Sequence, residues 1–443
     1  MFLKSSLAGL LIPVLCGLHS AAASMRSNPD GFFKPGPEIP ASLSDEFLYP
    51  RGSAFPFSFF SVGGGTEEKV NDLLPEAEVA KEFEYYKTLH IPLFGPQYEL
   101  NDRSLADAQK HGLEVVYTVG VPMGFHDRSG EGKKALSLSP EEITRQVKEQ
   151  VGAVAGNRSV ALWYLRPEEL RPWRKNEMAY LKAASEAVRA ADPLKRPLWI
   201  YDPAHASAKR LAAIAPWVDY IGKGMYPNYA SQKDSRIWCR WSMEQEVEAI
   251  RLAGSSAIPI AVPEMFRQPA DEDLAKIPAW VRHDVYLSLV SGAKGVMVFS
   301  ARRRPKFPAR QTYYDAYAKV ASELLGPLQL GKLFLFGEAR KEVVVDVTDG
   351  PAELELLFPS GGVKEPLRYP SVSFADLALG KDRYLILVNS ANAPVETSVG
   401  GMPYNAVRVE SLLDGSAPFD VGEGEFELHF EPYEVKALLL KRR

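Results

Sequence analysis

Two continuous apolar stretches decide the fold: residues 160–165 read Val-Ala-Leu-Trp-Tyr-Leu, and residues 295–300 read Gly-Val-Met-Val-Phe-Ser. A strand that is apolar at nearly every position is typical of a parallel sheet, because helices cover both faces of such a sheet. Six further β-rich runs lie before or between these two stretches: residues 57–63, 91–95, 114–120, 198–201, 218–223 and 259–262. Eight strands favour a closed (β/α)8 barrel over an open doubly wound sheet.

Amphipathic helical stretches alternate with these strands. Residues 75–89 begin with a proline and acidic residues, and Ser139-Pro140 predicts an N-cap followed by proline at the first helical position. Residues 176–191 and 243–253 repeat the helical period. Gly63-Gly64-Gly65 lacks the spacing of a phosphate-binding turn, so the α/β pattern indicates no nucleotide site.

The chain divides into three predicted parts. Lys4, the apolar run 7–18 and the alanines 21–23 have the pattern of a signal peptide over residues 1–23, which predicts a secreted or periplasmic protein. The barrel is expected over residues 24–330. From residue 331 to 443 short strands separated by turns such as Asp349-Gly350 predict a small all-β sandwich domain.

Composition limits the classes of partner. The 443 residues carry a formal net charge of −4, which gives no general attraction to nucleic acid or to an anionic membrane. No apolar run is long enough to span a bilayer, so we expect no membrane insertion after signal cleavage. Cys239 is the single cysteine after residue 23, and we expect it to be a packed core residue. No metal-binding or cofactor motif was found, and we expect neither group.

Carboxylates follow two strands that lie on opposite sides of the predicted barrel. Residues 163–169, Trp-Tyr-Leu-Arg-Pro-Glu-Glu, end the fourth strand, and Val262-Pro263-Glu264 ends the seventh. Catalytic groups of such barrels lie where strands end and βα loops begin. Cleavage of a glycosidic bond needs one carboxylic acid at the leaving oxygen and one carboxylate at the anomeric carbon. Glu264 and either Glu168 or Glu169 therefore form the candidate pair.

Residues 163–168 resemble the Trp-x-x-x-(Asn/Asp)-Glu-Pro segment of clan A glycoside hydrolases, the "4/7" barrels. The resemblance extends over most of residues 55–325 in strand order and includes a trailing β-sandwich. It implies that Glu168 is the general acid/base and Glu264 the nucleophile of a retaining hydrolase. The sequence departs from the pattern in two places, because Pro167 replaces Asn or Asp and Glu169 replaces Pro. Glu169 therefore stays open as the alternative acid.

Positive and aromatic side chains cluster near the same strand ends. Arginine recognises sulfate and carboxylate groups through two parallel hydrogen bonds, which favours an anionic, sulfated or uronate-bearing glycan. The alternative is that these cations pair with nearby glutamates and hold loops in place. The candidate substrate-binding residues are Arg166, Trp173, Asp202, His205, Lys223, Tyr226, Arg267 and Arg302. Further cations of the cluster are Arg171, Arg174, Lys175, Arg303, Arg304 and Lys306, and His126-Asp127 could also line the cleft.

The sequence thus predicts a secreted, cofactor-independent glycoside hydrolase that acts on a polysaccharide or oligosaccharide. Two other classes stay open. A glycan-binding barrel without catalytic activity is compatible with the departures at Pro167 and Glu169. A polysaccharide lyase would use a base and a charge-neutralising arginine on uronates.

Overall fold

The computed structural model describes residues 43, 45–66, 68–69, 74–97, 101–121, 137–166, 168–202, 206–232, 234, 236–357, 366–402, 407–422 and 424–443. The predicted signal peptide, residues 1–23, lies outside these ranges. Within them, no helix combines the length and the apolar character that a membrane span requires.

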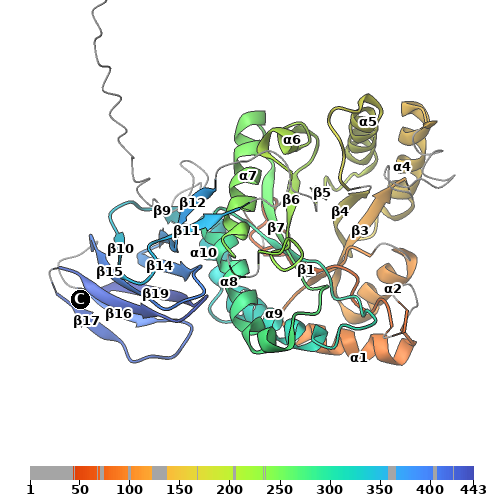
Figure 1. Cartoon of the computed structure of the whole chain (residues 1–443). Helices are drawn as coiled ribbons and strands as arrows, with labels where there is room; N and C mark the ends of the chain where they lie inside the picture. The colour runs from red at the N-terminus through yellow and green to blue at the C-terminus, as the bar shows by residue number, and fades with distance from the viewer. Residues whose placement is uncertain are drawn as a thin grey trace, which may run out of the picture.

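Eight parallel strands form the wall of a barrel (Figure 1). They are β1 (Phe57–Phe59), β2 (Leu93–Phe94), β3 (Glu114–Gly120), β4 (Val160–Arg166), β5 (Leu198–Asp202), β6 (Tyr220–Met225), β7 (Ile258–Pro263) and β8 (Val296–Val298). Their order in the sheet is β1-β8-β7-β6-β5-β4-β3-β2. Two backbone hydrogen bonds join β1 to β2 and close the ring: Gly95 N–H to Phe59 O (3.1 Å) and Ser61 N–H to Pro96 O (3.0 Å). The predicted barrel is confirmed.

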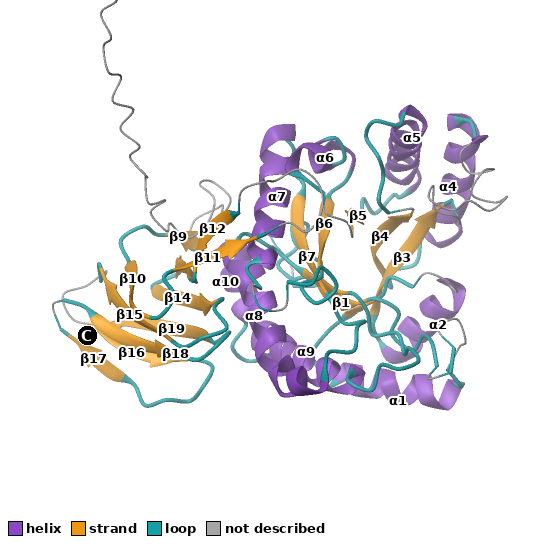
Figure 2. Cartoon of the chain, viewed as in Figure 1, coloured by secondary structure: helices purple, strands orange, loops and turns teal. Residues whose placement is uncertain are grey.

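Helices surround this wall (Figure 2). They are α1 (Glu76–Lys87), α2 (Asn101–His111), α4 (Pro140–Val154), α5 (Lys175–Ala191), α6 (Ala208–Ala212), α7 (Trp238–Ala253), α8 (Ile277–Val290) and α9 (Arg310–Leu325). Helix α4 begins as predicted, because the Ser139 side chain accepts a hydrogen bond from Glu142 N–H at 3.2 Å. This bond satisfies one of the backbone donors that a helix N-terminus leaves unpaired.

Side chains fill the inside of the barrel. Alternate residues of each strand point inward, and along β7 these are Ile258, Ile260 and Val262, which belong to the interior cluster with Tyr164 of β4 and Met297 of β8. Large rings occupy the centre, where Phe60 packs edge-on against Tyr164, Trp199, Tyr201 and Phe299. Glu264 follows Val262 in the same alternation, so the strand pattern directs it toward the barrel mouth.

An antiparallel domain follows the short helix α10 (Leu330–Phe336). One sheet has the order β10-β15-β18, a second has β17-β16-β19-β14-β13-β9, and β11 pairs with β12. The strands are β9 (Glu338–Ala339), β10 (Val344–Asp349), β11 (Glu353–Leu356), β12 (Leu367–Pro370), β13 (Val372–Leu379), β14 (Asp382–Asn389), β15 (Val395–Gly400), β16 (Val407–Ser411), β17 (Phe419–Val421), β18 (Phe426–Phe430) and β19 (Val435–Arg442). The two larger sheets share a core of their own. The predicted barrel-plus-sandwich fold is confirmed, while the domain limits at residues 330 and 331 stay a prediction.

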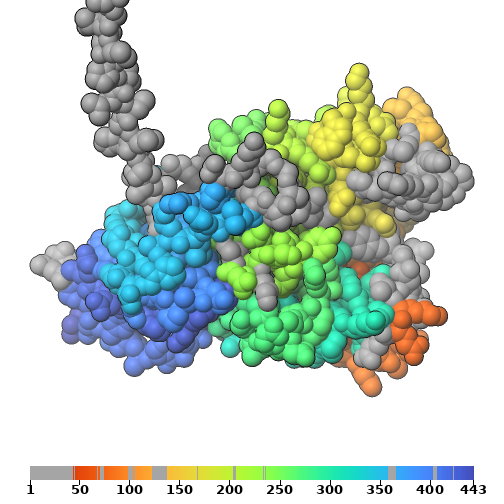
Figure 3. Space-filling model, in the orientation of Figure 1, coloured from red at the N-terminus to blue at the C-terminus, as the bar shows by residue number. Residues whose placement is uncertain are grey.

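Helix α8 lies at the seam between the two domains (Figure 1). The space-filling view shows the C-terminal domain, in blue, packed directly against the barrel (Figure 3). It contacts β7 of the barrel on one side and β13, β14 and β19 of the sandwich on the other. It is therefore buried around most of its circumference, and it carries the polar side chains of His283 and Asp284 into this interior. One hydrophobic cluster includes barrel residues such as Leu287 together with sandwich residues such as Ile386 and Ala437. The two domains thus share a continuous core.

Two glycine substitutions test the packing inside the barrel and the open surface of α4. A Cβ on Gly222, inside the barrel, would lie 2.9 Å from both Trp199 Nε1 and Tyr201 Cβ, whereas a Cβ on Gly152 of α4 would meet nothing within 4 Å. We expect Gly222→Ala to lower the free energy of unfolding by about 1–3 kcal/mol through overpacking. Gly152→Ala should raise it by about 0.5–1 kcal/mol, since alanine suits a helix better. Urea denaturation followed by circular dichroism measures both, and equal effects of the two variants would contradict the packing described.

Candidate active site

The candidate site lies at the C-terminal ends of β4, β6 and β7. Glu168 follows β4, Tyr226 follows β6 and Glu264 follows β7. Because all barrel strands run parallel, these ends face the same mouth. The predicted residues Glu168, Tyr226 and Glu264 are therefore on one face of the barrel.

Glu264 is buried, and both oxygens of its carboxylate accept hydrogen bonds. Its side chain is 2% exposed. One oxygen accepts a hydrogen bond from Asn228 N–H at 2.6 Å, and the other accepts one from Tyr229 N–H at 3.2 Å. Burial raises the pKa of Glu264 to about 7, while the positive charge of Arg236 and these two N–H groups limit the rise. At neutral pH the group is therefore close to its own titration midpoint.

Glu168 turns back toward the interior of the barrel. Its Oε1 accepts a hydrogen bond from the hydroxyl of Tyr164, an interior residue of β4. Glu169 adopts a φ of +57°, the left-handed region that is unfavourable for residues other than glycine. The chain therefore turns sharply directly after Glu168. This arrangement favours Glu168 over Glu169 as the partner of Glu264.

Tyr226 lies on the same face of the barrel as the candidate carboxyl groups. Its side chain is buried, and burial is the main reason that the pKa of its hydroxyl lies well above the ordinary value. The negative charges of Glu168, Glu264 and Glu169 raise this pKa further. The carboxyl groups that follow β4 and β7 therefore both lie within electrostatic range of the Tyr226 hydroxyl.

Aromatic and cationic side chains lie around the Tyr226 ring. The Tyr226 ring packs against Phe266 and Phe299. The guanidinium of Arg304 lies 5.9 Å from the Phe266 ring centre and 5.8 Å from that of Phe299, and Arg304 Nη2 donates to Ser300 Oγ at 2.7 Å. Flat rings of this kind suit the C–H faces of sugars, and an arginine held beside them suits an anionic substituent.

Other predicted residues lie farther out. Trp173 is 67% exposed, with the Arg210 guanidinium 5.7 Å from its ring centre. Arg267 is exposed and its Nη1 donates to the carbonyls of Asn228 and Tyr229 at 3.3 and 3.4 Å. Thus Arg267 binds carbonyl groups of the same two residues whose N–H groups bind Glu264.

Several cations of the cluster hold loops in place. Arg171 binds the buried carboxylate of Glu177, and Arg174 lies 3.7 Å from the same group. Arg303 binds Glu78 of α1 at 2.9 Å. These ion pairs fit the alternative interpretation, in which the cations pair with nearby glutamates and hold loops in place.

Arg302 and Arg166 are both half-buried at the barrel rim. The Arg302 side chain packs over the loop after β1, since a Cβ on Gly65 would lie 2.9 Å from its Cγ. Arg166 ends β4, and its carbonyl accepts a hydrogen bond from the Tyr180 hydroxyl.

The positions of Lys223 and Asp202 do not fit the substrate-binding role that the sequence suggested for them. Lys223 is fully buried, with its Nζ 4.2 Å from the ring centre of Trp241 and 3.1 Å from Ser242 Oγ, both on α7. Asp202 is 2% exposed and pairs with Arg210 at 2.8 Å. Both side chains alternate outward from the barrel axis, so the structure places them between wall and helices instead of at the mouth. Burial lowers the pKa of Lys223 to about 8.

Three further residues named in the sequence analysis are not placed. His205, His126 and Asp127 lie outside the described residues. Cys239 is fully buried in α7, and burial raises the pKa of its thiol well above the ordinary value, which fits the expected packing role. Among the described residues, no group of three or more His, Cys, Asp or Glu side chains could hold a metal ion.

Sequence reasoning missed Asn228 and Arg236. Asn228 acts through its backbone N–H, which no side-chain pattern reveals. Arg236 lies beyond the strand end, in the segment that leads into α7. The Tyr226-Pro227-Asn228-Tyr229 run directly after a strand was the one available signal.

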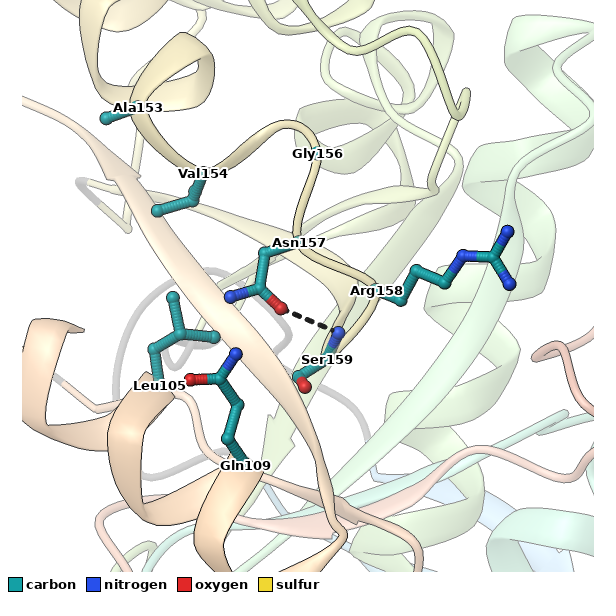
Figure 4. Close-up of a pocket in the computed structure, with 8 residues that line it drawn as sticks. All are labelled: Leu105, Gln109, Ala153, Val154, Gly156, Asn157, Arg158 and Ser159. Carbon is teal, nitrogen blue, oxygen red and sulfur yellow. Dashed lines mark hydrogen bonds between the residues drawn. The ribbon is translucent and has the colours of Figure 1, made fainter.

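A surface hollow on the barrel lies away from these carboxyl groups (Figure 4). Residues from α2, the end of α4 and the following turn line it, among them Gln109, Asn157 and Ser159. Asn157 Oδ1 accepts a hydrogen bond from Ser159 N–H at 2.9 Å. This turn precedes β4, so the hollow is at the opposite end of the strand from Glu168.

The raised pKa of Glu264 predicts a pH-dependent stability difference. Since the pKa is about 7 in the folded protein and 4.5 ordinarily, the folded state binds more protons between these values, and stability falls as pH rises from about 4.5 to 7. Glu264→Gln cannot ionise, so we expect it to exceed the wild type in unfolding free energy by a margin that grows by about 3 kcal/mol over this range. Urea titrations at pH 4.5, 6 and 8 measure the margin. Parallel pH curves for the two proteins would contradict the assignment.

Comparisons with known proteins identify the fold. No family model and no curated protein sequence matches the chain. Solved structures do match, and one is an alpha-amylase from Geobacillus thermoleovorans complexed with acarbose, with 10% identity, a TM-score of 0.53 and coverage of 88% of this chain and 99% of that chain. An Anoxybacillus alpha-amylase has 10% identity, a TM-score of 0.54 and coverage of 88% and 98%. A structure described as a glycoside hydrolase has 13% identity, a TM-score of 0.54 and coverage of 90% and 96%. The chain therefore has the barrel-plus-sandwich fold that these glycoside hydrolases share.

Proposed function

We propose that this protein is a glycoside hydrolase whose reaction takes place at the barrel mouth between Glu168 and Glu264. The observation that carries the proposal is that Glu168 and Glu264 follow β4 and β7 at the same mouth of the barrel, with Glu168 bound by the Tyr164 hydroxyl. Glycosidic cleavage requires two such groups on either side of one bond. The match to structures described as an alpha-amylase complexed with acarbose and AmyP in complex with maltose supports a carbohydrate substrate.

The two carboxyl groups take different roles in this proposal. Glu264 is the nucleophile, and the N–H groups of Asn228 and Tyr229 together with Arg236 stabilise its ionised form. Glu168 is the general acid/base, oriented by the Tyr164 hydroxyl. The products would keep the anomeric configuration, because a glycosyl-enzyme intermediate inverts it twice.

The proposed substrate is an anionic polysaccharide or oligosaccharide met outside the cytoplasm. Arg304, held against Phe266 and Phe299, supports recognition of a carboxylate or sulfate group beside a sugar ring. The exposed Arg267 adds positive charge at the same rim. Export rests on the expected signal peptide at residues 1–23.

A second candidate function is glycan binding without hydrolysis. One observation favours it: Glu264 is only 2% exposed, and both of its oxygens already accept backbone hydrogen bonds. A carboxylate in this position stabilises the loop after β6 whether or not it reacts. The two functions differ in whether new reducing ends form. An unsaturated product would instead indicate the lyase reaction.

We expect Glu264→Gln and Glu168→Gln each to lower kcat at least about a hundredfold while glycan binding persists. Reducing-end release from neutral, uronate-bearing and sulfated polysaccharides measures the rate, and ultraviolet absorbance detects an unsaturated product. In the wild type kcat/KM should rise with pH through about 7, since the nucleophile must be ionised. An undiminished rate in Glu264→Gln would remove Glu264 from the reaction.

Arg304→Gln tests the proposed substrate charge. We expect KM for an anionic glycan to rise about tenfold, the range of one charge-assisted hydrogen bond, with little change for a neutral glycan. Arg303→Gln is the matched control, since Arg303 is the neighbouring arginine and binds Glu78. Equal losses on neutral and anionic substrates would argue against charge recognition by Arg304.

A further inference from the structure

The backbone of the loop after β6 binds the Glu264 carboxylate, and buried side chains from other elements in turn bind this loop. Asn228 donates its N–H to Glu264, while its side chain binds two buried groups. Asn228 Oδ1 accepts a hydrogen bond from Arg236 Nη1 at 3.2 Å, and Nδ2 donates to the Tyr313 hydroxyl at 3.2 Å. The position of the Asn228 N–H, and hence that of the Glu264 carboxylate, depends on these groups.

Arg236 is anchored by an ion pair inside the protein. The side chain is 1% exposed and stacks with its guanidinium carbon 4.6 Å from the Trp280 ring centre. Its Nε donates to Asp284 Oδ1 at 2.8 Å, and its Nη2 donates to Asp284 Oδ2. The two parallel hydrogen bonds fix the plane of the guanidinium and so direct Nη1 at Asn228.

Asp284 is in turn connected to the sandwich domain through His283. His283 Nδ1 lies 2.9 Å from Asp284 Oδ1, and Nε2 lies 2.9 Å from Ser390 Oγ, directly after β14. Burial lowers the pKa of His283, so the ring is neutral. Since a carboxylate only accepts, Nδ1 carries the proton and Nε2 accepts from the Ser390 hydroxyl. The Ser390 N–H donates to Ser371 O at 2.7 Å, which ties the chain to β13.

We propose that the chain Ser390–His283–Asp284–Arg236 positions Asn228 and thereby Glu264, so that the sandwich domain supplies part of the active-site machinery. Its members are positioning residues, because none touches the proposed substrate. Their effect on catalysis rests on the proposed function. Their effect on Glu264 itself does not.

The charge arrangement supports this connection. The Arg236 cation stabilises the ionised Glu264, and the Asp284 anion opposes it. Because the ion pair is buried beside Glu264, water screens it little. Titratable or charged groups whose fields couple to Glu264 include Arg236 and Cys239 of the α7 region, Asp284 of α8, Tyr313 and Tyr317 of α9, and Tyr226 after β6. Arg236 and Asp284 are the two of these that carry opposite full charges at neutral pH.

A second serine at the same domain seam provides the control. Ser373 Oγ of β13 accepts a hydrogen bond from Arg240 Nη1 at 2.9 Å, and Arg240 binds Glu244. This contact also joins the sandwich to α7, yet within the described part of the chain the Arg240 side chain bonds to Ser373 and Glu244 and not to the loop that holds Glu264. Both serines are buried, so removal of either hydroxyl costs the seam one side-chain hydrogen bond.

The kinetic experiment compares Ser390→Ala with Ser373→Ala in the full chain. We expect Ser390→Ala to lower kcat about two- to tenfold, the range of one hydrogen bond, with KM unchanged. Ser373→Ala should leave kcat within experimental error. Equal kcat values for the two variants would overturn the proposal, since the seam would then act only through overall stability.

An infrared titration tests the chain without any substrate. The carboxyl band that Glu264→Gln removes reports the protonation of Glu264. We expect Asp284→Asn to lower the titration midpoint, because it removes the opposing negative charge, and Arg236→Gln/Asp284→Asn to raise it relative to Asp284→Asn. The double variant removes both buried charges together, which avoids an unpaired charge and preserves the fold. Unchanged midpoints in both variants would overturn the proposal.

The two proposals fail separately. Shifted midpoints in a protein that hydrolyses no glycan would support the positioning chain and refute the proposed hydrolase. Hydrolysis by the wild type, with Ser390→Ala indistinguishable from Ser373→Ala, would support the hydrolase and refute the chain.

Discussion

The burial of the Glu264 carboxyl group is the constraint on which the rest of the site depends. A charge removed from water is tolerated only if donors and counter-charges surround it. Here two backbone N–H groups of the loop after β6 supply the donors, and Arg236 supplies the counter-charge. Arg236 is itself buried and therefore requires Asp284. One buried carboxyl group thus fixes the shape of the loop after β6 and the approach of α7 and α8.

The fold was predictable where a segment has one simple pattern of apolar residues. The runs at 160–165 and 295–300 are covered on both faces, so they lack polar positions and are recognisable as parallel strands. Helix α8 was missed for the related reason: it is buried on nearly every side, and a helix without a polar face has no amphipathic period.

The site was predictable only in its strand-end positions. Glu264 and Glu168 follow from the rule that barrel strands end at the active face. Lys223 and Asp202 were placed by proximity in sequence alone, although the alternation of side chains along β5 and β6 directs them outward. Asn228 and Arg236 could not be found in this way, because their roles depend on how a loop folds against two helices that are distant in sequence.

The position of α8 between the barrel and the sandwich has a consequence for how such a chain can evolve. A barrel that lost its sandwich would expose the outer side of α8, an apolar surface of the kind that promotes aggregation in an isolated domain. The neutral ring of His283 would also lose its partner on Ser390. Recombination could therefore not exchange the second domain as an interchangeable module, and the two domains are expected to be inherited together as one unit.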